Sequence, residues 1–305
     1  MTNFNLVKNK NYFLGFSALL ITTSLVVLLM WGLKLGLDFT GGSLLEVDFK
    51  DQRPTNQAIE EKLTPLVEKP IVIPTGDKGA IIKMKLVDEA KHQEVLISLK
   101  ELTGSVDTDS VTEKRFEMIG PTVSSDLRTK SFLAILFVLL AIVIYIALAF
   151  RKVSRPVSSW KYGVAAVLAL LHDVIIPAGV FAALGHFMGV EIDTLFVTAL
   201  LTVLGFSVHD TIVVFDRIRE NLLKFPRENF DEIVNRSVNQ TFVRSINTSL
   251  TVLLVLLATF FFGGESVRYF VLALIVGVFF GTYSSIFIAS PILIIWNRFS
   301  SKKGV

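Results

Sequence analysis

Long apolar runs separated by polar segments dominate this chain. An α-helix needs roughly 20 residues to cross a bilayer, and 52% of all residues are hydrophobic. The apolar runs are Tyr12–Leu33, Ser131–Phe150, Tyr162–Leu184, Thr194–Phe215, Ser249–Phe262 and Tyr269–Trp296. The fifth run is short unless residues 242–248 join it, which would bury Arg244, and the last run must tilt or protrude. The pattern predicts a polytopic α-helical membrane protein with six transmembrane helices.

The polar segment 34–130, between the first and second runs, is large enough for a small domain. Alternating or β-rich stretches predict strands, and helical spacing behind a capping residue predicts helices. Strands are expected at Leu44–Phe49, Ile71–Ile73, Ala80–Leu86 and Asp109–Met118, and helices after Pro54-Thr55 and from Asp88 to Gly104. The order βαββαβ predicts a small α+β ferredoxin-like domain. Gly120-Pro121 then ends the last strand before the second span.

Basic side chains gather on one side of a chain with six spans. They are Lys8, Lys10, Arg151, Lys152, Arg155, Lys161, Arg217, Arg219, Lys224, Arg227, Arg236, Arg244, Arg298, Lys302 and Lys303. The opposite short loops hold Arg268 beside acids. Cytoplasmic loops are enriched in Lys and Arg, so both termini are expected in the cytoplasm and 34–130 outside. The net charge of +3 then reflects topology and does not indicate nucleic acid.

These features divide the chain into three parts. Residues 1–33 form a cytoplasmic N-terminus and a first helix that we interpret as a retained anchor, since Trp31-Gly32-Leu33-Lys34 is a poor signal-peptide cleavage site. Residues 34–130 form the outer domain. Residues 131–305 form a five-helix bundle with a cytoplasmic linker at 216–243. Within that linker, the apolar face of Phe230, Ile233, Val234 and Val238 predicts an amphipathic helix at the membrane interface, or a surface helix covering the loop.

Two acids lie inside the apolar runs, where a charge is costly and usually functional. Asp210 lies near the cytoplasmic end of the fourth run and Asp173 near the middle of the third. Asp210 could also be an ordinary helix-end acid, and Asp173 a structural hydrogen-bonding group. Arg244 is either a snorkelling anchor at the interface or a buried partner of an acid. His172 and His209 each precede an acid, but neighbouring helix positions point about 100° apart, so their roles stay open.

Enzymatic sites are not indicated. The chain has no cysteine, which excludes disulfides and thiolate sites. Gly205-Phe206-Ser207-Val208 matches the GxSx pattern of intramembrane serine proteases, but no histidine follows His209 to complete such a site. Metal binding has weak support from two histidines on different helices. We therefore expect no catalytic residue, no metal and no cofactor. Gly277 and Gly281 form a GxxxG pattern in the last span, which we interpret as a structural packing face with a partner subunit as a candidate neighbour.

Three sequence motifs together resemble one family. They are Gly36-Leu37-Asp38-Phe39-Thr40-Gly41-Gly42 directly after the first span, Thr211–Asn221, and Arg244–Ser249. With six spans and a small βαββαβ domain, they make the chain similar to the SecD/SecF family of bacterial protein-export membrane proteins, which is related to the RND transporters. Phe39 and the small size of the outer domain favour the SecF branch. Gly36, Asp38, Phe39, Gly41, Gly42, Asp216 and Arg217 fall on the family motifs.

The resemblance implies a function. Members of the SecF branch pair with SecD in the bacterial cytoplasmic membrane, act on the SecYEG translocon, and use the proton-motive force to promote export of unfolded polypeptide. In that family an acid of the fourth span and an arginine at the start of the fifth are implicated in proton passage; they fall on Asp210 and Arg244, and we add Asp173 as a relay candidate. The sequence does not choose between H⁺ and Na⁺. Half of an RND-type small-molecule or lipid transporter, or a purely structural subunit, remain alternatives.

Overall fold

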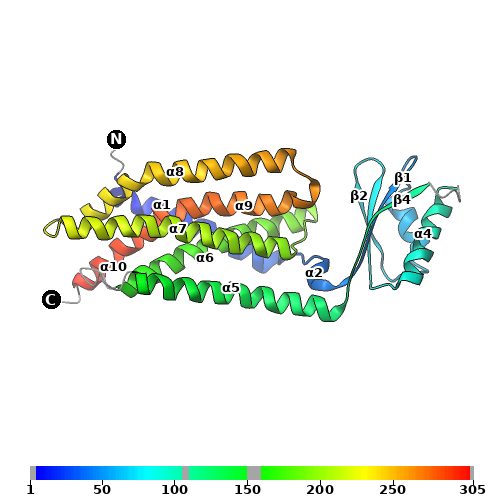
Figure 1. Ribbon diagram of the computed structural model, residues 1–305, viewed down its shortest axis with the longest axis horizontal. Coiled ribbons are helices and arrows are strands. Elements are labelled where there is room, and N and C mark those ends of the chain that lie inside the picture. The colour runs from blue at the N-terminus through cyan, green and yellow to red at the C-terminus, as the bar shows by residue number, and fades with distance from the viewer. Residues whose placement is uncertain (1–4, 105–109, 150–158, 303–305) are drawn as a thin grey trace. The chain divides into compact units, whose positions relative to one another are not determined.

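The structure is a computed structural model that describes residues 5–104, 110–149 and 159–302. Some sequence-based expectations fall on residues outside these ranges, namely those for Asp109, Phe150, Arg151, Lys152, Arg155 and Lys303. The chain divides into two compact units. One is the outer unit, Leu35–Ser131, and the other is the membrane unit, which comprises 1–34 and 132–305 (Figure 1).

The described part of the outer unit is built on a four-stranded antiparallel sheet that packs against the helices α3 and α4. Its elements are β1 (Gly42–Phe49), α3 (Asn56–Leu63), β2 (Ile71–Thr75), β3 (Gly79–Met84), α4 (Glu89–Leu102) and β4 (Val111–Ile119), after a short helix α2 (Leu37–Thr40). The strand order is β2-β3-β1-β4. The chain order βαββαβ with this strand order confirms the predicted ferredoxin-like domain. A single apolar core that includes Leu45, Ile59, Ile82 and Leu99 lies between the sheet and its helices.

Local signals set the helix boundaries in this unit. The Thr55 side chain accepts a hydrogen bond from the backbone N–H of Ala58, and Asp88 accepts one from Lys91 at 2.9 Å. Both satisfy N–H groups that a helix start leaves free. Gly104 follows α4 with φ +73°, a left-handed conformation that glycine adopts without strain. These are the start and stop signals that the sequence predicted.

The membrane unit is a bundle of long helices (Figure 1). They are α1 (Leu6–Trp31), α5 (Pro121–Ala149), α6 (Ser159–Met188), α7 (Thr194–Lys224), α8 (Phe230–Phe262), α9 (Glu265–Ser284), the π-helical turn η1 (Ser285–Ala289) and α10 (Ser290–Lys302). The first residues of α5, up to Ser131, belong to the outer unit. The elements α9, η1 and α10 form one apolar stretch, so six helices of the described chain are long and apolar enough to cross a membrane. This confirms the predicted number of spans. The π-helical turn inside the last span was not predicted.

The prediction of a separate interfacial helix in 229–238 was wrong. That segment is the first part of α8, which continues without a break to Phe262. Its apolar face does not lie on a membrane surface, because Phe230, Val234 and Val238 belong to the buried core of the bundle. The sequence pattern separates this first part of α8 from the fifth apolar run because the polar stretch 235–248 lies between them. Of the expected linker 216–243, only 225–229 lies outside helices α7 and α8.

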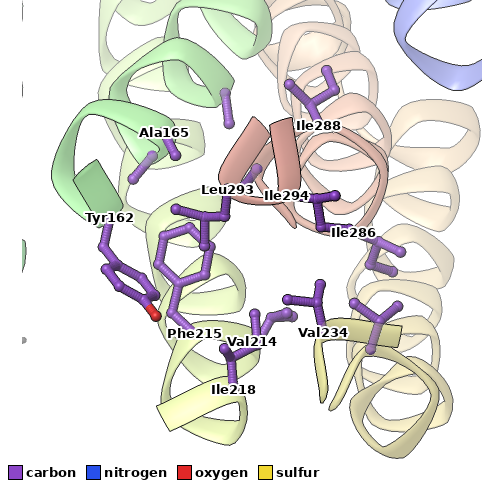
Figure 2. Packing of buried hydrophobic residues seen from close by; sticks show 14 of the residues in the cluster. Tyr162, Ala165, Val214, Phe215, Ile218, Val234, Ile286, Ile288, Leu293 and Ile294 are labelled. Carbon is purple, nitrogen blue, oxygen red and sulfur yellow. The ribbon is translucent and has the colours of Figure 1, made fainter. Parts of the chain in front are cut away.

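The bundle core lies where α6, α7, α8 and the last span meet (Figure 2). Tyr162 and Phe215 pack edge to face there, with ring centroids 5.2 Å apart. Ile294 and Val234 bring the last span and α8 to the same cluster. This packing fixes the side of α7 that faces the other helices, and Asp210 lies on that buried side.

The GxxxG pattern packs inside this chain. A Cβ atom on Gly277 would lie 2.2 Å from the Cγ2 atom of Val203, and one on Gly281 would lie 3.0 Å from the Cβ atom of Ser207. Both contacts are with α7, so the glycines let α7 and α9 approach closely. The pattern is structural, as expected, but it faces α7 rather than a partner subunit.

Candidate functional site

Asp210 is buried on α7 and held by hydroxyl groups from two other elements. Its Oδ1 atom accepts a hydrogen bond from Ser245 Oγ of α8 at 3.0 Å, and its Oδ2 atom lies 3.4 Å from Ser285 Oγ of η1. Its side chain is 5% exposed. Hydroxyls can donate to a charged carboxylate or accept from a protonated carboxyl. The site therefore suits both protonation states of Asp210.

Asp173 is fully buried on α6 and has a denser set of partners. Ser207 Oγ of α7 lies 2.5 Å from its Oδ2 atom, and Ser284 Oγ of α9 lies 2.7 Å from the same atom. On the other oxygen, Oδ1, the Nδ1 atom of His172 lies at 2.9 Å. Two hydroxyl groups and one imidazole nitrogen around the carboxyl group compensate for the water that burial removes. Asp173 thereby connects α6 to both α7 and α9.

His172 belongs to the Asp173 site, whereas His209 does not contribute a hydrogen bond to Asp210. The His172 ring is fully buried and lies beside the rings of Phe280 and Tyr283, at centroid distances of 6.1 and 6.0 Å. Its Nε2 atom has no hydrogen-bond partner among the described residues. His209 is exposed. Only one of the two His-Asp pairs in the sequence is therefore a bonded pair in the structure.

Arg244 lies close to Asp210 without binding it. No ion pair joins the two side chains within the part of the chain that the structure describes, and Arg244 is adjacent in the chain to Ser245, which does bond Asp210. Arg244 is exposed and lines a pocket of about 290 Å³ between α7 and α8, together with Asp216 and Glu220. It is therefore not the buried partner that one reading of the sequence proposed, and its neighbour Ser245 makes the contact with the acid.

The first family motif positions the start of the sheet. Gly41 and Gly42 have φ values of +71° and +128°, and a Cβ atom on Gly42 would lie 2.7 Å from the carbonyl oxygen of Met84. Only glycine satisfies both the backbone angle and this close approach. Gly36 precedes α2 as its N-cap, Asp38 lies in the first turn of that helix, and Phe39 is buried. These residues form a structural entry into β1.

The second family motif joins α7 to α8. Asp216 pairs with Arg219 at 2.6 Å, and Arg217 bonds Gln240 of α8 at 2.6 Å as well as Glu220. Nearby, the buried amide of Asn221 donates to Ser237 and to Gln240, both at 2.8 Å. The bonds that Arg217 and Asn221 make to Gln240 and Ser237 hold the end of α7 against the start of α8. The pair of Asp216 with Arg219 lies within α7 itself.

Sequence reasoning missed the four serines that bind the two acids. Ser207, Ser245, Ser284 and Ser285 lie in apolar runs, where isolated serines are common and usually bond their own helix backbone. Only the pairing of helices reveals which of them face an acid. For a metal, the described chain offers no group of three or more His, Asp or Glu side chains close enough to hold an ion.

Comparison with known proteins places this chain in a family. The model of the SecD/SecF C-terminal protein-export region matches residues 98–299, and that of the SecD/SecF GG motif matches residues 32–52. A protein translocase subunit SecF of Thermobaculum terrenum is 43% identical, over 96% of this chain and 94% of its own length. A second, from Anaerolinea thermophila, is 39% identical over the same shares.

Solved structures give the same result for the fold. The crystal structure of SecDF from Thermus thermophilus, a translocon-associated membrane protein, matches 97% of this chain with a TM-score of 0.80 and 32% identity. A SecDF crystal structure in a super-membrane-facing form matches 99% of this chain with a TM-score of 0.70. This chain spans only 39% and 40% of those longer chains. By family models, curated relatives and solved structure alike, the chain belongs to the SecD/SecF family of protein-export membrane proteins, as a protein translocase subunit of the SecF type.

Proposed function

We propose that this subunit pairs with SecD on the SecYEG translocon and uses the proton-motive force to promote export of unfolded polypeptide, without a catalytic reaction of its own. The names of its relatives and the description of the solved SecDF structure as translocon-associated support this proposal. We further propose that it lies in the bacterial cytoplasmic membrane, surrounded by lipid, with both termini in the cytoplasm.

The environment of Asp210 is the observation that carries the proposal. This acid lies in an apolar span and is reached by hydroxyl groups of two other elements, α8 and η1. The hydroxyls can donate hydrogen bonds to the charged carboxylate, and they can accept one from the protonated carboxyl group. Proton uptake on Asp210 would therefore bias how three helices pack, which is how a proton gradient can drive movement.

Arg244 acts in this proposal through its charge. It is exposed at the surface between α7 and α8, and a positive charge near a carboxyl group favours the charged carboxylate. Movement of Arg244 away from Asp210 would favour proton uptake. Asp173 is the second buried acid of the pathway, held between α6, α7 and α9 by His172, Ser207 and Ser284.

The bundle supports an assembly with a second set of spans. Large apolar side chains are exposed along α5, among them Phe132, Phe137 and Ile144, and along α8, among them Leu254 and Val255. Lipid and a SecD subunit both suit such faces. The solved SecDF chains are more than twice as long as this one, and the chain matches about two fifths of each.

The placement of basic residues supports the proposed orientation. The backbone N–H of Leu6 bonds Asn235 at 2.9 Å, and Arg298 pairs with Asp231. These contacts bring the start of α1, the start of α8 and the end of α10 to one end of the bundle. Lys8, Arg236 and Arg298 then lie at the same end, as the positive-inside rule expects of a cytoplasmic side.

An export assay of two acid variants tests the proposal. The complete subunit is assembled with SecD and the translocon in membrane vesicles, and export is measured with and without an imposed proton gradient. Asp210→Asn keeps the shape of the side chain and loses its titration, so it should abolish the gradient-dependent part of export. Glu265→Gln, an exposed acid in the first turn of α9, is the matched control and should export normally. Normal gradient-driven export by Asp210→Asn would end the proton proposal.

A flux assay tests the need for the partner. Liposomes that contain only this chain should not carry a proton current, whereas liposomes with the SecD pair should. Replacing the proton gradient by a sodium gradient in the same liposomes identifies the coupling ion. A half-transporter for small molecules or lipids is not favoured, because the relatives compared above are SecF translocase subunits.

A further inference from the structure

Hydrogen-bond partners of the two buried acids, Asp173 and Asp210, lie side by side in the last span. Ser284, the last residue of α9, bonds Asp173 of α6, and Ser285, the first residue of the π-helical turn η1, contacts Asp210 of α7. The serines are consecutive in the chain. A displacement of one backbone segment therefore changes the hydrogen bonding of both acids.

Each serine hydroxyl has a second acceptor within reach. Ser284 Oγ lies 3.1 Å from the carbonyl oxygen of Gly281, and Ser285 Oγ lies 3.1 Å from that of Thr282. A hydroxyl carries one proton and can donate to only one acceptor at a time. Each serine thus has two hydrogen-bonding positions, one toward its acid and one toward the helix backbone.

The π-helical turn allows the backbone of this segment to change its hydrogen bonding. A π-helix bonds its backbone with a wider spacing than an α-helix, and such turns within α-helices occur frequently at functional sites. Here the turn begins at the residue that contacts Asp210. The segment is also bonded to α8, because Thr282 Oγ1 lies 2.5 Å from Ser249 Oγ of that helix. Thr282 is the residue whose carbonyl oxygen can accept a hydrogen bond from Ser285.

We infer that the consecutive serines Ser284 and Ser285 couple Asp210 to Asp173 through the backbone turn that carries both, so that protonation of Asp210 alters the bonding of Asp173. The inference rests on the proposed function, because it requires that Asp210 take up a proton. When Asp210 is charged, Ser285 donates to it. When Asp210 is protonated, its O–H donates to Ser285, which turns its own proton to the carbonyl of Thr282. The proton stays on Asp210, and the change reaches Asp173 through the shared turn.

Other charged or titratable groups near the two acids are few among the described residues. His209 is next to Asp210 in the chain, and Arg244 is next to its partner Ser245, but both side chains are exposed. His172 bonds Asp173, and the Tyr283 ring lies beside His172. None of these four side chains makes a hydrogen bond to both acids. The two consecutive serines are positioning residues, and the backbone turn that they share connects the hydrogen bonds of one acid to those of the other.

Infrared spectroscopy of the complex can detect this link. The complete subunit is reconstituted with SecD, and difference spectra between acidic and neutral buffer record the carbonyl stretch of protonated carboxyl groups. The band that Asp210→Asn removes belongs to Asp210. Ser285→Ala, which removes a direct contact, should shift this band. Ser284→Ala should shift it too, although Ser284 makes no bond to Asp210. Ser284→Thr retains the hydroxyl and should restore the original frequency.

Ser290→Ala is the matched control, because Ser290 is fully buried on the same span and bonds neither acid. It should leave the Asp210 band in place. If Ser284→Ala does not assemble with SecD, Ser284→Cys supplies the same test with a weaker donor. An Asp210 band that stays at its original frequency in the Ser284 variant overturns this inference alone. Spectra in which Asp210→Asn removes no band overturn the proposed function and the inference together.

Discussion

The hydroxyl of Ser245 lies 3.0 Å from the Oδ1 atom of Asp210, so α8 holds the buried acid of α7 through a neutral donor. The preceding residue, Arg244, points into a surface pocket beside Asp216 and Glu220. On α8, Ser245 therefore makes the contact with Asp210, and its neighbour Arg244 supplies the positive charge. This arrangement matters because a hydroxyl can serve both protonation states of the acid, whereas a bonded guanidinium would hold it charged.

This geometry predicts different outcomes at the two positions. Arg244→Lys keeps the positive charge and breaks no bidentate contact, so gradient-driven export should persist, while Arg244→Ala should reduce it. Ser245→Ala removes a hydrogen bond to a charged group, worth about 1.5–3 kcal/mol, and should reduce gradient-driven export about tenfold or more. Export from vesicles with and without a proton gradient measures each effect.

Thr248→Ala is the matched control for Ser245→Ala. Thr248 is exposed on the same helix and its hydroxyl bonds only its own backbone at Arg244 among the described residues. It should export normally. A severe defect in Arg244→Lys together with normal export in Ser245→Ala would mean that the guanidinium, rather than the hydroxyl, holds the acid during the transport cycle.

Close packing at Gly277 gives a stability prediction. Gly277→Ala places a methyl group 2.2 Å from Val203 Cγ2, so α7 and α9 must separate. We expect a loss of about 1–3 kcal/mol, the usual cost of overpacking, seen as a lower unfolding temperature of the purified complex. Val203→Ala in the same chain removes the clashing methyl groups and should recover part of the loss.

Gly15→Ala serves as the control for that experiment, since nothing lies within 4 Å of a Cβ atom there. It should unfold at the temperature of the unmodified chain. Equal unfolding temperatures for the Gly277 and Gly15 variants would show that α7 and α9 are not closely packed in the membrane.

The architecture could be predicted from the sequence because each span and each strand has its own hydrophobic pattern. Length and hydrophobicity identify spans one by one, and alternation identifies strands such as Leu44–Phe49. The extent of α8 was harder to predict. Its polar stretch around Asn239 and Arg244 interrupts the apolar signal, and the helix continues there because its buried face packs on α7 while its polar face stays exposed.

The sites were predicted only in part, for a different reason. An acid in an apolar span is costly to bury and is therefore usually functional. For this reason the sequence alone made Asp210 and Asp173 candidates. A serine in the same span has no such cost because it can bond its own helix. Ser284 and Ser285 gain their role only from which helices lie opposite, and the π-helical turn that carries them leaves no periodic pattern.

The outer domain should fold without the spans. Residues 35–131 form a compact unit with its own apolar core, so the isolated segment should give a circular dichroism spectrum of mixed helix and strand. Leu45→Ala empties a fully buried position on β1 and should cost about 2–5 kcal/mol in denaturant unfolding. Ile71→Ala, 58% exposed on β2, is the control and should cost far less. A segment that is unfolded in native buffer would mean that the domain depends on the membrane unit.

Gly42 gives the sharpest test of why the double glycine is present. Its φ of +128° is strained for any residue with a Cβ atom, and that atom would lie 2.7 Å from the carbonyl oxygen of Met84. Because Gly42 pairs with Ile119 where β1 begins, Gly42→Ala should loosen the central strand and cost about 1–3 kcal/mol. Gly120→Ala is the control, since a Cβ atom there meets nothing within 4 Å. Denaturant unfolding of the isolated domain measures both. If the two variants are equally stable, the second glycine is not required by the fold, and its role must lie in a contact outside this domain.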